Sequence, residues 1–300
     1  MFNKKIFFAV MILAILSAIV GSVVGGQDAT NTVYVSPSRN DGNTGTSDAP
    51  FKTIKKAVEV APNGGTVFIK SGLYYAKDGN SNILIDKDLN IVGEDKETTT
   101  IDCSDVKNTL NDRGELVRSH IFKFSPPTTG SNQTFKVKNL TFQNQDINAQ
   151  YTIEMYSDSN ATVESCDFIN NQGVYLIYAF NYDKGSLTNC NIKVLNCSFT
   201  NNSMRMGLAE IRNGGGSHGL YSTVVGCNIV NNSGGYAALS LGYDSLVSDS
   251  YFSGNTGIKA NDIYHCTGAG GIKLHNTTFV PSRDSSTPSI FNEYGYTIEV

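Results

Sequence analysis

One nine-residue motif occurs six times from residue 137 onward, and its spacing restricts the fold more than any other feature of the sequence. Its fullest form is Val-x-x-Cys-x-Phe-x-Asn-Asn. The phenylalanine position, which holds isoleucine in the fourth copy, recurs at intervals of 26, 31, 30, 23 and 27 residues. Helical and leucine-rich repeats keep a closer period, whereas a β-helix lets each coil carry a loop of its own length. The copies begin at Val137, Val163, Val194, Val224, Val247 and Leu274.

The order of side chains within the motif predicts a strand, a sharp corner and a second strand. Side chains alternate between the two faces of a strand, so Cys166, Phe168 and Asn170 share one face. Val163 has the opposite parity, and it reaches the same interior only if the chain bends at Ser165. Asn, Asp and Gly, which are frequent at this position, tolerate the left-handed backbone of a tight corner. The corner residues of the six copies are Asn139, Ser165, Asn196, Gly226, Asp249 and Asn276.

A further short strand precedes several copies, as in Tyr151 to Tyr156, so that each coil contains three strands. We therefore predict an all-β fold, a single-stranded right-handed parallel β-helix. Coils about 4.8 Å apart place like residues over one another, which puts Val, Cys and Phe stacks in the core. At the next corner we expect an amide ladder built from Asn144, Asn170, Asn201 and Asn231.

The N-terminal part has a different pattern. Lys4 and Lys5 precede an apolar run from Ile6 to Val24, which is typical of a secretory signal. We assign residues 1–26 to a signal peptide, with an uncleaved membrane anchor as the alternative, because nineteen residues also suffice to span a bilayer. Both interpretations place the rest of the chain outside the membrane. An anchor would be its only membrane contact.

Residues 27–82 are expected to form an N-terminal cap and the first coils, and residues 83–300 the β-helix itself. Apolar residues at 51, 54, 57, 58 and 61 have helical spacing, and Asp48 and Pro50 stand where a helix start is expected. A short helix there would cover the open end of the first coil. At the other end, Tyr296 to Val300 nearly repeats Tyr151 to Met155. Our hypothesis is that the C-terminus is truncated or that dimerisation covers it.

The cysteines and charges exclude several classes of site. Cys166, Cys197 and Cys227 occupy the stacked core position, whereas Cys103, Cys190 and Cys266 lie outside it and their pairing stays open. We predict no metal site, because no CxxC or Cys/His ligand spacing occurs and the four histidines are dispersed.

Net charge is −4, or −6 without Lys4 and Lys5, and no block of Lys and Arg is present. These features argue against a nucleic-acid partner.

Seven Asn-x-Ser/Thr sequons occur, most of them at corners or in the expected ladder. We expect only Asn132 and Asn160 to lie in loops, so we predict these two as glycosylation sites.

Three segments then suggest a family. They run from Tyr34 to Thr46, from Ala49 to Ala57 and from Gly65 to Tyr74, and they resemble the first segment of pectin-lyase-like β-helix proteins. With the Asn-Asn coils, the chain is similar to adhesin-like surface proteins of methanogenic archaea. The resemblance covers most of the chain. It implies the β-helix fold and a surface role, although polysaccharide lyases and polygalacturonases share that fold.

Candidate functional residues lie on the outward face between motif copies. The weak catalytic candidates are Glu154, Glu210 and Arg212, and Glu154 and Glu210 should be two coils, or roughly 10 Å, apart. We predict an exported, adhesin-like surface protein that binds extracellular polysaccharide or cell-surface glycans without catalysis and without a cofactor. The alternatives are a polysaccharide lyase or glycoside hydrolase, the lyase with Ca²⁺, and a structural spacer. The ligand-binding candidates are Tyr156, Tyr178, Tyr243 and His218.

Overall fold

The computed structural model describes residues 31–125, 133–156, 159–181, 190–213, 220–242, 244–266, 270–281, 286–293 and 298–299. The signal or anchor assigned to residues 1–26 lies outside these ranges. Within them, no helix is both long and apolar enough to cross a membrane.

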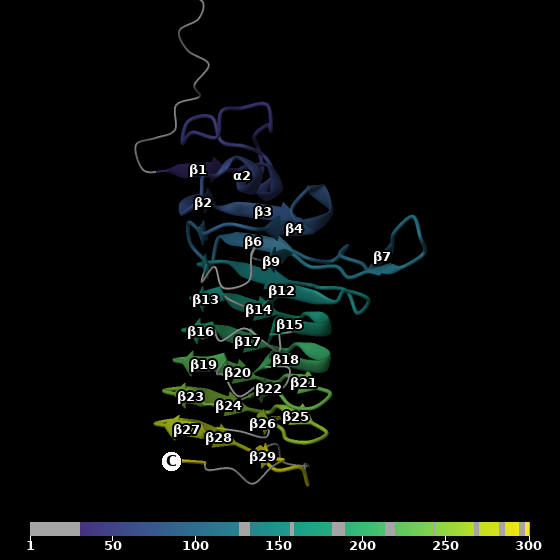
Figure 1. Cartoon of the computed structure of the whole chain (residues 1–300), viewed down its shortest axis with the longest axis vertical. Coiled ribbons are helices and arrows are strands. Elements are labelled where there is room, and N and C mark those ends of the chain that lie inside the picture. Colours follow the sequence, from purple (N-terminus) through teal and green to yellow (C-terminus); the bar gives the residue numbers. More distant parts are fainter. Residues whose placement is uncertain are drawn as a thin grey trace, which may run out of the picture.

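Successive coils stack along one axis, and their strands pair in parallel into long sheets (Figure 1). Within the described ranges, sheet A contains β1 (Thr32–Val35), β2 (Gly65–Ile69), β5 (Leu89–Gly93), β10 (Gln133–Lys138), β13 (Ser159–Glu164), β16 (Cys190–Leu195), β19 (Leu220–Val225), β23 (Ser245–Ser248), β27 (Ile272–His275) and β30 (Ile298–Glu299). Sheet B contains β3 (Gly72–Tyr75), β6 (Thr99–Asp102), β11 (Thr141–Gln143), β14 (Asp167–Ile169), β17 (Ser198–Thr200), β20 (Asn228–Val230), β24 (Tyr251–Ser253) and β28 (Thr278–Val280).

The third long sheet is sheet C. It contains β4 (Ile83–Ile85), β9 (Phe122–Phe124), β12 (Tyr151–Tyr156), β15 (Gln172–Asn181), β18 (Ser203–Asn213), β22 (Leu239–Leu241), β26 (Ile263–His265) and β29 (Ile290–Asn292). Beside β18 lies β21 (Ser233–Gly234), which in turn pairs with β25 (Thr256–Gly257). A 3₁₀ turn, η1 (Ala76–Asp78), follows β3. An antiparallel hairpin of β7 (Thr109–Leu110) and β8 (Leu116–Val117) projects sideways from the coils (Figure 1). The predicted all-β, right-handed parallel β-helix is confirmed.

In the six coils that carry the motif, the corner between sheets A and B is a single left-handed residue. All six predicted corner residues have positive φ, from 46° at Asn276 to 66° at Gly226. The side chains before and after the corner can therefore both point inward, as the alternation of side chains in the motif predicted. The cysteine stack is also confirmed, because Cys166, Cys197 and Cys227 are free and buried and the strands that follow them pair in register. Cys103 is free and buried and Cys266 is free and half-buried, while the side chain of Cys190 lies outside the described residues.

The predicted amide ladder was placed one residue too early. Asn144, Asn170, Asn201 and Asn231 have left-handed φ angles of 55° to 60°, and they are exposed. A left-handed residue bends the chain around the corner, so its own side chain points outward and the next one points inward. The ladder therefore runs through the buried residues Asn171, Asn202, Asn232 and Asn255.

The expected capping helix is present as α2 (Ile54–Val60), which is the α-helix of the described residues and packs beside β1 at the first coil (Figure 1). It buries Ile54, Ala57 and Val58. It begins later than Asp48 and Pro50 suggested, because Thr53 caps it: the Thr53 hydroxyl oxygen accepts from the Lys56 amide at 3.2 Å.

Candidate functional site

The outer face of sheet C carries a column of side chains that contains both acidic candidates. Residues in adjacent strands align as Lys123, Glu154, Tyr178, Glu210, Ser240 and Tyr264. Their neighbours along each strand, such as Ile153 and Met155, belong to the core, so the column faces outward. The predicted spacing of two coils between Glu154 and Glu210 is confirmed.

Both acids are buried although they point away from the core. Glu154 is 1% exposed and Glu210 is 2% exposed. A charged carboxylate leaves water only where other groups replace its hydration, so these are not the solvated surface acids of an ordinary β-sheet face. Tyr178, expected as an exposed contact, is also buried, because it stacks on Tyr151 with ring centres 4.7 Å apart.

The first group of polar residues surrounds Glu154. Its Oε2 lies 3.7 Å from Lys123 Nζ and 3.7 Å from His120 Nδ1. Burial, with a smaller contribution from the Lys123 charge, lowers the pKa of His120 to about 4. The imidazole is therefore neutral at pH 7, and its contact with Glu154 is not an ion pair. The group combines an ammonium, a carboxylate and a neutral imidazole on one surface.

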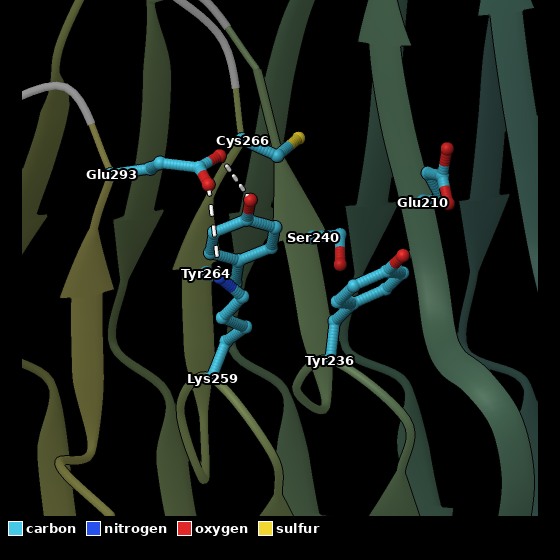
Figure 2. Close-up of a pocket in the computed structure, with 7 residues that line it drawn as sticks. All are labelled: Glu210, Tyr236, Ser240, Lys259, Tyr264, Cys266 and Glu293. Atoms are coloured by element: carbon cyan, nitrogen blue, oxygen red, sulfur yellow. Dashed lines mark hydrogen bonds and ion pairs between the residues drawn. The ribbon is translucent and has the colours of Figure 1, made fainter.

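The second group forms a cavity of about 250 Å³ farther along the same face, which we call the tyrosine pocket. Tyr236 and Tyr264 stack within it, with ring centres 5.7 Å apart and planes 23° apart. Figure 2 shows Ser240 between Tyr264 and Glu210 and close to Tyr236, with Glu293 on the far side of Tyr264 and the Lys259 amine beside Tyr264. The pocket is lined by Glu210, Tyr236, Ser240, Lys259, Tyr264, Cys266 and Glu293.

One wall of the tyrosine pocket is fixed by Glu293. Its Oε2 accepts a short hydrogen bond from the Tyr264 hydroxyl, and its Oε1 lies 3.7 Å from Lys259 Nζ (Figure 2). The Lys259 ammonium also lies 5.8 Å from the centre of the Phe291 ring. These contacts hold a carboxylate, a phenol and an ammonium in one arrangement before any ligand binds.

Ser240 is the unusual member of the pocket. It is 2% exposed, and its hydroxyl makes no hydrogen bond to the described residues. A buried hydroxyl without a partner costs roughly 1–3 kcal/mol, so such groups are rare in folded proteins. A polar ligand in the tyrosine pocket would supply the partner that Ser240 lacks.

Several site residues predicted from the sequence do not belong to either of these two groups. Arg212 lies in β18 and Tyr156 in β12, but their side chains are outside the described residues, as are His218, Tyr243 and Asn132 entirely. The placement of Asn160 in a loop was wrong. It lies in β13, and its Oδ1 accepts from the backbone and side-chain amides of Asn191 at 3.3 and 3.4 Å. The pattern of β-strand pairing overrides the local polar composition there.

The calcium that the lyase alternative would require has no matching site in the described ranges. No three His, Cys, Asp or Glu side chains there converge as metal ligands. Calcium is held by six to eight oxygen ligands, most of them carboxylates and carbonyls. We therefore derive no step through calcium.

The sequence matches the model of the Pel9A-like family, described as a right-handed β-helix region, over residues 33–278. No curated protein matches it. A solved rhamnogalacturonan lyase is similar with a TM-score of 0.50 and 17% identity, covering 84% of this chain and 74% of that one. Pectin methylesterase PemA from Erwinia chrysanthemi has a TM-score of 0.42 and 12% identity, covering 86% of this chain and 92% of that one. At these identities the likeness is one of fold.

Proposed function

The chain belongs to the Pel9A-like right-handed β-helix family, and we propose that it is an exported surface protein that binds an extracellular polysaccharide or cell-surface glycan without cleaving it. The binding site is the tyrosine pocket on the outer face of sheet C. The observation that carries this proposal is the buried Ser240 hydroxyl, which lacks a partner beside two stacked tyrosines. The adhesin-like role predicted above is the setting in which such binding would act.

The chemistry of the pocket suits a sugar. A pyranose ring offers a flat C–H face and a rim of hydroxyl groups. Tyrosine offers a flat apolar face with a polar edge, and Tyr236 is 38% exposed at the pocket. The hydroxyls of a bound sugar can donate to the carboxylates of Glu210 and Glu293 and can pair with Ser240.

Substitution of Ser240 gives a specific test. Ser240→Ala removes a buried hydroxyl that has no partner, so the protein should be equally stable or up to about 1 kcal/mol more stable. The same variant should bind glycans several-fold more weakly, since it cannot pair with the ligand. Stability is measured by urea unfolding and binding by titration with a panel of soluble polysaccharides.

Ser245→Ala is the matched control, because Ser245 is also 2% exposed but its hydroxyl donates to the Gly242 carbonyl at 3.0 Å. It should lose stability and keep its glycan affinity. Unchanged glycan binding in Ser240→Ala, or no binding of any glycan by the unmodified protein, would contradict the proposed site. The second result would favour the structural spacer.

A second function, polysaccharide cleavage, is favoured by the group around Glu154. Lyases remove the proton next to a uronate carboxylate with a base, and hydrolases use two carboxyl groups. The neutral His120 can accept a proton, and Lys123 lies beside the same carboxylate. Incubation with polyuronides and neutral glycans separates the two functions. Unsaturated ends or new reducing ends, abolished in His120→Gln and Glu154→Gln, would establish cleavage and contradict simple binding.

A further inference from the structure

The charges of the tyrosine pocket indicate which class of sugar it accepts. We propose that it takes a sugar unit without a carboxylate, so that the chain prefers uncharged glycans to polyuronates. This inference rests on the proposed function, because it concerns the ligand of the same pocket. It separates this chain from what the names of its structural neighbours would suggest, since rhamnogalacturonan and pectin both contain uronic acids.

The first reason is that Lys259 is already paired. It is the cation among the described side chains that line the pocket, and its Nζ lies 3.7 Å from Glu293 Oε1. The Phe291 ring faces the same ammonium at 5.8 Å. A uronate would have to displace Glu293 from Lys259 to obtain a counter-charge. That exchange replaces one ion pair by another and gains little.

The second reason is that the pocket wall already contains two acidic side chains. Glu293 is held in place by the Tyr264 hydroxyl as well as by Lys259, so it cannot swing away from an incoming anion without losing both contacts. Glu210 contributes a second acid, which is 2% exposed. Like charges placed close together in a partly dehydrated site repel strongly, and such repulsion is a common source of selectivity.

Uncharged sugars meet no such obstacle. Carboxylates accept hydrogen bonds from sugar hydroxyls, and such charge-assisted hydrogen bonds are stronger than those between neutral groups. The Ser240 hydroxyl can donate or accept, and the tyrosine rings contact a sugar face whatever its charge. Charge is therefore the property on which this pocket discriminates between otherwise similar sugars.

The test compares oligogalacturonate with the same oligosaccharide after complete methyl esterification, which removes the charge and keeps the backbone. Calorimetric titration should show the esterified form binding at least tenfold more tightly. Glu293→Gln releases Lys259 and removes one negative charge, so the preference should fall to about threefold or less. Glu59→Gln is the matched control, because Glu59 also pairs with a lysine, Lys56, at 4.0 Å but lies on α2 outside the pocket.

The outcomes separate the two claims. Equal or tighter binding of the unesterified oligosaccharide would overturn the inference and leave the proposed function standing. A preference that is unchanged in Glu293→Gln would overturn the role assigned to Glu293 and Lys259. If neither form nor any neutral glycan of matching length binds, both the inference and the proposed function fail.

Discussion

The side-chain amide of Asn202 donates to the Oδ1 of Asn232 at 2.9 Å, one link in a ladder that joins coil to coil inside the β-helix. The same amide donates to the Phe168 carbonyl at 2.9 Å, and the backbone N–H of Asn202 donates to Asn232 Oδ1 at 2.9 Å. The ladder ends where Asn255 donates to a carboxylate oxygen of Asp262 at 3.0 Å. It satisfies polar groups at a corner that is buried from water, which is why each link should be costly to remove.

Replacing Asn202 should therefore cost more than replacing its exposed neighbour. Asn202→Ala removes a side-chain hydrogen bond to the Phe168 carbonyl and takes away the acceptor of two N–H groups of Asn171, so we expect a loss of about 3 kcal/mol in unfolding free energy. Asn201→Ala loses only the tolerance of Asn for the left-handed backbone, about 1 kcal/mol. Urea unfolding of both variants decides the point. A larger loss at Asn201 would return the ladder to the position the sequence first suggested.

A pH dependence should follow from His120. Its pKa is about 4 in the folded protein and near 6.5 when unfolded, so the unfolded chain binds the extra proton between these values. The associated stability is fully present above pH 6.5 and is lost as the pH falls toward 4. We expect a loss of about 2 kcal/mol from pH 7.5 to pH 5.

His120→Gln isolates this effect from the many carboxylates that titrate in the same range. The unfolding free energy of the unmodified protein minus that of the variant should become about 2 kcal/mol smaller as the pH falls from 7.5 to 5. A difference that stays constant with pH would show that His120 is not held neutral in the folded state.

The helix cap offers a local prediction at the N-terminal end. Thr53 accepts from the Lys56 amide, and its hydroxyl donates to Asp41 Oδ2 at 2.8 Å. Thr53→Ala should lower the unfolding free energy by about 1 kcal/mol, and Thr53→Ser should keep most of it because the hydroxyl remains. Thermal unfolding of the two variants measures this. Equal losses would mean that the methyl group of Thr53, not its hydroxyl, stabilises the start of α2.

The sequence predicted the fold because the motif encodes it residue by residue. The parity change between Val163 and Phe168 required a left-handed corner, and Ser165 has a φ of 52°. The ladder was misplaced because composition does not show which of two adjacent asparagines turns inward, and Asn170 and Asn171 look alike in the sequence. Pairing across coils decides this, since only Asn171 can reach Asn202.

The site was predicted only in part. Glu154 and Glu210 were identified because they interrupt apolar strands, and their alignment followed from the repeat. Ser240, Tyr264 and Glu293 carry no motif. They were missed because the register of sheet C aligns Ser240 with Tyr264, and a side-chain contact joins Glu293 to Tyr264. The signal was nevertheless present: Ser240 and Tyr264 occupy the same column position as Glu210.

The central claim is that glycans bind at the tyrosine pocket on the outer face of sheet C. Its most direct test is calorimetric titration of Tyr236→Ala and Tyr251→Ala with the tightest-binding uncharged glycan. These tyrosines are similarly exposed, at 38% and 42%, but Tyr251 lies on β24 in sheet B, away from the pocket. The account predicts that Tyr236→Ala weakens binding at least tenfold and that Tyr251→Ala leaves it within twofold. Equal affinity in the two variants, or a loss confined to Tyr251→Ala, would contradict it.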